Sequence, residues 1–130
     1  MKPHLNAELF ETPISTHWFD ENGILCGLSK KAERKIEHYQ ELIKLYKQLT
    51  KNGNKLCVLA DSTNSSTMSK DVVEYISTEQ PKYLKAMAIV STIPLGTTQV
   101  NTFLKLSFSN FPVMNFACEI EATAWLKEHL

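Results

Sequence analysis

Residues 55–90 read KLCVLADSTNSSTMSKDVVEYISTEQPKYLKAMAIV, and this stretch decides the fold. Its two short apolar runs, 56–60 and 86–90, have no polar alternation, which is typical of strands buried on both faces. Between them, apolar residues recur at helical spacing over 69–80, and Pro81 ends that helix. A strand, a helix and a second strand in this order predict two parallel strands joined by a right-handed crossover.

The chain before this unit predicts a β-hairpin followed by a long helix. Residues 14–28, ISTHWFDENGILCGL, hold two β-forming runs around the sequence DENG. Asn22-Gly23 within it supplies the positive φ angles that a tight hairpin turn requires. Over 31–51, apolar residues recur every three or four positions while Lys, Arg and Glu fill the other face, which predicts an amphipathic helix. Gly53 is well placed to end it.

The chain after this unit predicts two further helices and one more strand. Apolar residues recur at helical spacing over 98–108, residues 112–118 (PVMNFAC) form a short β-like run, and residues 119–130 return to a helical period. Strands that alternate with helices predict one α/β domain with a mostly parallel sheet, which here opens with the hairpin and carries about four helices. We place this domain at 14–130, after an N-terminal extension at 1–13.

The charge of the chain is balanced overall but segregated along its length. The 130 residues include 14 Lys plus Arg and 14 Asp plus Glu. Residues 30–55 hold eight basic and three acidic residues, a net charge of +5, so the rest of the chain carries −5. Because the protein has no overall positive charge to attract polyanions, we expect no nucleic-acid partner.

The chain carries no sign of secretion, membrane insertion or metal binding. No apolar run has the length of a transmembrane helix, and residues 1–13 lack the apolar core of a signal peptide. Cys26, Cys57 and Cys118 are far apart and lie among apolar residues, so we expect them to be packed as small hydrophobic side chains. These observations predict a cytoplasmic protein with no metal and no cofactor.

Four segments carry a family resemblance. They are ENGIL at 21–25, VLAD with MSKDVVEYI at 58–76, AIVSTIPLGTTQVNTFLKL at 88–106, and FPVMNFACEIEATAWLKEHL at 111–130. Their sequence and order resemble the bacterial STAS-like, or anti-anti-sigma-factor-like, domains, and within them a small uncharacterised stand-alone branch. The resemblance implies a central sheet of four or five strands with helices packed mainly on one side.

The resemblance also implies a function in protein–protein regulation. In STAS-like regulators, a partner kinase phosphorylates a Ser or Thr near the start of the second helix, just past a strand that ends in Asp. The matching loop here holds Asp61, Ser62, Ser65, Ser66 and Ser69. In the regulators a Gly or small residue follows the acceptor, and this loop departs from that pattern in having no Gly. Ser69 is equally suited to cap the helix that follows. We therefore expect a non-enzymatic interaction module, with a protein partner and a switch in the 62–69 loop.

Two alternatives remain open. An enzyme would use Asp61 with His17 or a loop serine, but the chain has no nucleophile elbow, phosphate-binding loop or zinc motif, so we expect no catalytic activity. An apolar-ligand or lipid-binding module is the stronger alternative, because STAS-like domains are similar in fold to CRAL-TRIO lipid carriers. Its ligand, or a second copy of the chain in a homodimer, would contact an apolar group on the helix predicted at 98–108, formed by Val100, Phe103, Leu104 and Phe108.

Overall fold

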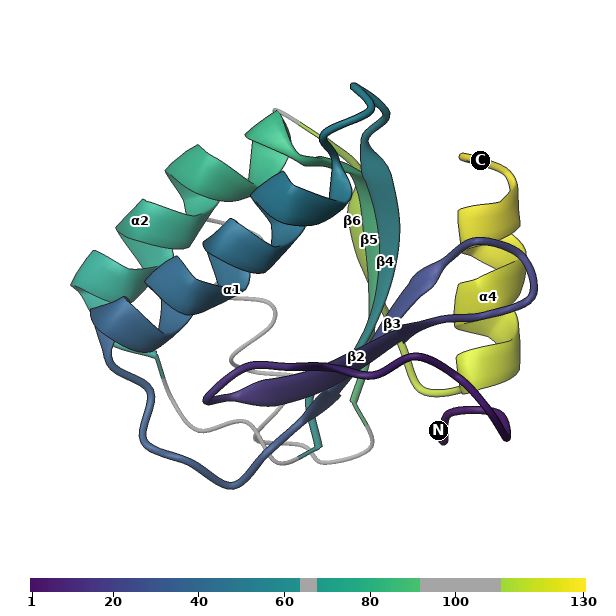
Figure 1. The fold of residues 1–130 in the computed structure, drawn as a ribbon, viewed down its shortest axis with the longest axis horizontal. Coiled ribbons are helices and arrows are strands. Elements are labelled where there is room, and N and C mark those ends of the chain that lie inside the picture. Colours follow the sequence, from purple (N-terminus) through teal and green to yellow (C-terminus); the bar gives the residue numbers. More distant parts are fainter. Residues whose placement is uncertain (64–67, 92–110) are drawn as a thin grey trace.

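The structure, a computed structural model, describes residues 1–63, 68–91 and 111–130, whose strands form one mixed sheet (Figure 1). The six strands lie side by side in chain order: β1 (Phe10–Glu11), β2 (Ser15–Phe19), β3 (Leu25–Ser29), β4 (Leu56–Asp61), β5 (Leu84–Val90) and β6 (Val113–Phe116). The pairs β1–β2 and β2–β3 are antiparallel, and the pairs from β3 to β6 are parallel. The predicted α/β domain with a mostly parallel sheet and an opening hairpin is confirmed.

Within residues 1–63, 68–91 and 111–130, three α-helices cover the two faces of this sheet. They are α1 (Ile36–Leu49), α2 (Lys70–Glu79), which continues into the short 3-10 helix η1 (Gln80–Lys82), and α4 (Glu119–Lys127). In Figure 1, α1 and α2 lie together on one face and α4 lies on the other. Each parallel strand is added on the same side of the one before it. Right-handed crossovers therefore place α1 and α2 on the same face.

The strand and helix counts differ from the expectation in two respects. The sheet has six strands rather than four or five, because Phe10 and Glu11 pair with β2 as the short strand β1. A strand of two residues is too short to show an alternating pattern. Among the described helices, α1 and α2 share one face, and α4 covers the second face. The helix expected at 98–108 lies outside the described residues.

Local hydrogen bonds explain where the first elements turn and begin. Gly23 has a φ of +81° in the β2–β3 turn, where Asp20 Oδ1 accepts hydrogen bonds from the Asn22 and Ile24 N–H groups at 2.8 and 2.9 Å. The predicted hairpin is confirmed. Helix α1 begins at residue 36 rather than 31. At its start, the Lys35 N–H donates to His38 Nδ1 at 3.2 Å, a side-chain interaction that the helical periodicity does not reveal.

The sheet separates two hydrophobic cores. One lies under α1 and α2, and its fully buried members come from the hairpin, from β4 and β5 and from both helices. The other lies under α4 and includes Trp18, Cys26, Cys57 and Leu126. Alternate residues of β4 and β5 enter different cores, so both strands are buried on both faces, as their continuous apolar sequence predicts.

A close contact between Gly27 and His17 fixes the packing of the hairpin on the α1 side. The two residues are directly paired across β2 and β3. A Cβ atom added to Gly27 would lie 2.7 Å from His17 Cε1, which is below any normal contact distance. The same ring meets Tyr46 of α1 edge to face, with ring centroids 6.3 Å apart. Gly27 therefore leaves the space that the buried imidazole occupies between the sheet and α1.

The substitution Gly27→Ala is expected to lower the free energy of unfolding by about 1–3 kcal/mol, because the new methyl group overlaps the His17 ring. Urea denaturation measures this loss. The same substitution in a His17→Ala background serves as the control, since the truncated side chain leaves room for the methyl group. An equal loss in both backgrounds would show that the ring contact is not the cause.

Candidate functional site

The loop expected to carry a switch leaves the sheet at its carboxyl edge, where the parallel strands end. Asp61 is the last residue of β4, and its Oδ1 accepts a hydrogen bond from the Thr63 N–H at 2.9 Å. Ser62 is tied to the neighbouring strand, because its N–H and its hydroxyl both donate to the Val90 carbonyl, at 3.0 and 3.2 Å. The Ser62 hydroxyl is therefore half-buried and already engaged.

Ser69 is the exposed hydroxyl at the start of α2. It occupies the N-cap position with an extended backbone, but its side chain makes no capping hydrogen bond to the helix. The expectation that Ser69 caps the helix is therefore correct in position and wrong in its hydrogen bond. The hydroxyl instead donates to the carboxylate of Asp71 in the first turn, and this bond above all lowers the pKa of Asp71.

The remaining candidate residues lie outside the described part of the chain. These are Ser65 and Ser66 of the loop, and the apolar group Val100, Phe103, Leu104 and Phe108.

The structure gathers four serines at the carboxyl edge that the sequence analysis did not connect. Ser15 and Ser29 are paired across β2 and β3. The parallel register of β3, β4 and β5, continued by one residue, places Ser29, Ser62 and Ser91 in the same row. Ser15, Ser29 and Ser91 are buried. Ser29, Ser62 and Ser91 each end or directly follow an apolar strand. That position is the sequence signal by which the row could have been found.

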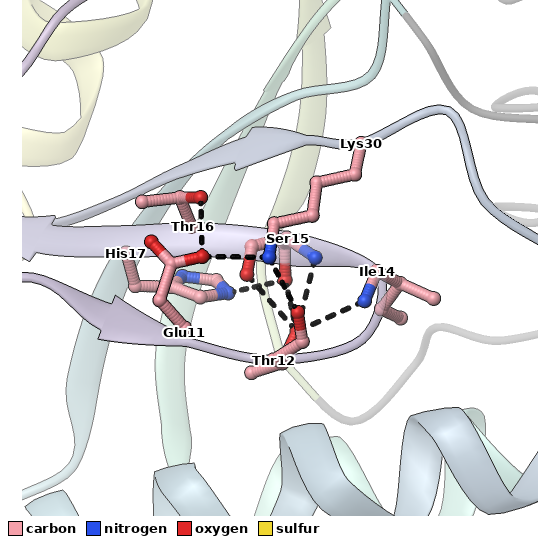
Figure 2. Close-up of polar contacts among 7 residues, drawn as sticks. All are labelled: Glu11, Thr12, Ile14, Ser15, Thr16, His17 and Lys30. Carbon is pink, nitrogen blue, oxygen red and sulfur yellow. Dashed lines mark hydrogen bonds and ion pairs between the residues drawn. The ribbon is translucent and has the colours of Figure 1, made fainter.

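The row ends in a buried hydrogen-bonded network of Thr12, Ser15 and His17, which Figure 2 shows. Ser15 Oγ lies 2.7 Å from His17 Nε2 and 2.8 Å from Thr12 Oγ1. Thr12 Oγ1 also accepts hydrogen bonds from the N–H groups of Ser15 and Ile14, at 3.0 and 3.3 Å. These contacts link the turn from β1 into β2 to the imidazole of His17 in β2.

An ion pair closes the solvent side of the network (Figure 2). Lys30 Nζ lies 2.6 Å from Glu11 Oε2 and donates to the Thr12 carbonyl at 2.9 Å. The Thr16 hydroxyl donates to the same Glu11 oxygen at 3.1 Å. The bond from Lys30 is the main reason that the pKa of Glu11 is lowered. Both charged side chains are partly exposed, so the pair contributes little to stability.

His17 is held in its neutral form. Its side chain is 3% exposed, and burial lowers its pKa to about 4. The distance between Ser15 Oγ and His17 Nε2 matches that of a nucleophile and its base. However, no carboxylate among the described residues hydrogen-bonds to His17 Nδ1, and both side chains are buried. This geometry fits an internal polar network that fixes the hairpin.

The sheet keeps His17 and Asp61 apart. Ser15, His17 and Phe19 point toward α1, since Phe19 packs in that core. Ala60 packs in the same core, so Asp61, the next residue of β4, points to the opposite face. The two side chains that the sequence offered for acid–base chemistry are therefore on different faces of the sheet, two strands apart.

The described residues hold no group of three or more His, Cys, Asp or Glu side chains that could bind a metal ion. Cys26 and Cys57 are buried in the core under α4, and burial raises the pKa of the Cys26 thiol to about 12. A search of the described segments finds no helix with the length and apolar character needed to cross a membrane.

Comparison with known proteins identifies the family. The model of a domain of unknown function, DUF7793, matches residues 17–130, from strand β2 to the end of the chain. The chain belongs to the DUF7793 family. The match covers the hairpin, the parallel strands and all three described α-helices, and leaves out β1 and Thr12. No curated protein and no solved structure matches the chain.

The buried neutral His17 is expected to make the protein less stable in acid. Its pKa is about 4 in the folded protein and about 6.5 in the unfolded chain, so only the unfolded chain gains a proton as the pH falls through this interval. Between about pH 7 and about pH 4.5, this difference costs about 2 kcal/mol of unfolding free energy. Urea denaturation at both pH values measures the loss.

The control is His17→Asn, which cannot titrate and whose stability should fall less over the same pH interval. A second measurement does not depend on that variant folding well. In the native protein, the NMR signals of the His17 ring should not titrate above about pH 5. A midpoint for His17 near pH 6.5 would contradict its burial as a neutral side chain.

Removal of the Ser69 hydroxyl is expected to have little effect on stability. Because the hydroxyl makes no backbone cap, Ser69→Ala should lower the free energy of unfolding by less than about 0.5 kcal/mol, whereas loss of a true serine cap costs about 1 kcal/mol. Thermal unfolding followed by circular dichroism measures the change. A loss equal to that of a true cap would restore the capping role.

Proposed function

We propose that this protein is a STAS-like regulatory module that binds a partner protein, and that phosphorylation of Ser69 switches this binding. The observation that carries the proposal is the exposed Ser69 hydroxyl at the start of α2, which bonds to Asp71 rather than to the helix backbone. This hydroxyl follows a parallel strand that ends in Asp61, as in the regulators that the sequence resembles.

Ser69 is the most accessible of the described loop serines. Ser62 is half-buried and donates its hydroxyl to the Val90 carbonyl, so a kinase would have to break that contact first. Ser69 is exposed, and replacement of its hydroxyl proton breaks only the bond to Asp71. Phosphorylation of Ser69 therefore disturbs the fold little.

A phosphate on Ser69 would change the start of α2 in a definite way. It adds nearly two negative charges beside the Asp71 carboxylate and removes one of the donors that hold this carboxylate. The N–H groups of Asp71 and Val72, which hydrogen-bond to the Asp71 carboxylate, are suited to hold the phosphate instead, and the Asp71 side chain is repelled into solvent. A partner that contacts this end of α2 would meet a new charge and a moved side chain.

The exposed side of α2 is suited to receive such a partner. Its buried side chains, Val72, Val73 and Ile76, face the core, while Asp71, Glu74 and Thr78 are exposed. The proposed docking surface thus adjoins the phosphorylation site on one rigid helix.

Phosphopeptide mapping of the protein purified from its own cells tests the proposal. Cleavage after Lys55 and Lys70 releases residues 56–70, a single peptide that holds Ser62, Ser65, Ser66 and Ser69. We expect one phosphate, located on Ser69 by fragmentation, and its loss in a Ser69→Ala variant expressed in the same cells. The matched control, Ser77→Ala, removes a hydroxyl from the same helix and should leave the phosphate in place.

Two results would contradict the proposal. A peptide that stays unmodified under all growth conditions would remove the switch, and a phosphate confined to Ser62, Ser65 or Ser66 would assign it to another residue. Native mass spectrometry of the same sample reports whether a protein or an apolar molecule is bound. A stoichiometric apolar molecule would favour the lipid-carrier alternative.

A further inference from the structure

The edge of the sheet opposite the serine row carries a cluster of lysines. Here α1 ends, η1 leads into β5, and the parallel strands begin (Figure 1). Five exposed lysines come from four separate parts of the chain, namely the last turn of α1, the turn before β4, η1 and β5 itself. We call them the lysine cluster: Lys47, Lys51, Lys55, Lys82 and Lys85.

The lysine cluster is largely uncompensated by acidic residues. Among the described residues, Lys82 is its only member in an ion pair, with Glu79 at 2.8 Å. Lys55 Nζ donates to the Pro81 carbonyl at 3.0 Å, which joins the turn before β4 to η1 without neutralising the charge. The balanced net charge of the chain therefore hides a local excess of positive charge at this edge.

Structural roles account for only part of the lysine cluster. Lys47 lies in the last turn of α1, where a cation offsets the negative end of the helix dipole. Lys55 holds η1. Lys85 is different, because the register of β4 and β5 shifts from the pair Leu56–Leu84 to the pair Cys57–Ala86 and leaves Lys85 without a partner. This irregularity places an exposed cation on a central strand, and such bulges re-aim side chains at functional sites.

We propose that the lysine cluster is a second docking surface, which binds an acidic segment of a partner protein. The cluster lies at the opposite edge of the sheet from Ser69. This proposal is therefore separate from the switch proposed above, and an experiment can contradict either one without contradicting the other. Several ammonium groups on separate flexible stems match carboxylates in an extended chain, which need no fixed bidentate geometry.

The surroundings of the cluster favour a protein segment over other anions. The cluster contains no arginine, and the rest of the chain outside 30–55 carries a charge of −5, which repels a long polyanion such as DNA. The large exposed hydrophobic residues of the described chain are Leu5, Leu9, Met114, Ile120 and Leu130, and none of them belongs to the elements that form the cluster. In the described part of the chain, the elements that form the cluster therefore offer no large exposed hydrophobic side chain for insertion into a lipid surface.

Fluorescence anisotropy with a short fluorescein-labelled oligoglutamate peptide tests the proposal. In the described part of the chain, the ammonium groups of three cluster lysines make no ion pair or hydrogen bond. The variant replaces these three, as Lys47→Gln, Lys51→Gln and Lys85→Gln. The matched control, Lys2→Gln, Lys31→Gln and Lys70→Gln, removes the same charge from exposed positions away from this edge of the sheet. We expect affinity at low salt to fall about tenfold or more in the first variant and less than about twofold in the control.

The outcomes that overturn the proposal are distinct. Equal losses in the two variants would show that only net charge matters, and no binding by the native protein at low salt would remove the surface. A DNA duplex or phosphatidylserine vesicles that displace the peptide at equal charge concentration would reassign the cluster to nucleic acid or to membranes. Thermal unfolding of each variant confirms that it is folded before binding is measured.

Discussion

Strands β4 and β5 lie in the middle of the sheet with both faces covered, and this two-sided burial determines the rest of the architecture. Val58 and Met87 pack under α1 and α2, while Leu59 and Ala88 pack under α4. Each large apolar side chain removed from water in this way contributes about 1.5–3 kcal/mol. Because the crossovers can supply helices to one face only, the second face needs α4 from the end of the chain.

The sequence was sufficient to predict those elements whose hydrophobic pattern is long enough to be read. The alternation of strands and helices predicted the parallel strands and α1, α2 and α4, and Asn22-Gly23 predicted the hairpin. It did not predict β1, which is two residues long and exists only because β2 is present to pair with it. The position of α4 on the second face was also missed, because an amphipathic pattern does not specify which face of a sheet a helix covers.

The candidate site was predictable in its location and not in its contacts. The loop after Asp61 was identified because it matches in position the loop that is phosphorylated in the STAS-like regulators, and the structure places it at the carboxyl edge of the parallel strands. The serine row depends on the register between neighbouring strands, and a single sequence gives no register. Ser69 was correctly placed at the start of α2. Its bond to Asp71 in preference to the backbone is a rotamer choice that residue types alone do not decide.

The two edges of the sheet differ in chemistry because the helices run between them. Hydroxyl groups collect where the parallel strands end, and the hydroxyl of Ser62 satisfies the Val90 carbonyl there. Lysines collect where the strands begin, beside the carboxyl ends of the preceding helices. Helix α2 spans the distance from one edge to the other, so a rigid element connects the two surfaces.

The strand order has a further consequence for how the protein is made. Every strand pairs with the one that precedes it in the chain, so no pairing has to wait for a distant segment. Each parallel pairing nevertheless closes a crossover of more than 20 residues, so the hairpin should form faster than the rest of the sheet. As the chain leaves the ribosome, the hairpin can form first and each strand can then dock on a finished edge. The face under α4 is completed after the other, because α4 follows all the other described elements in chain order.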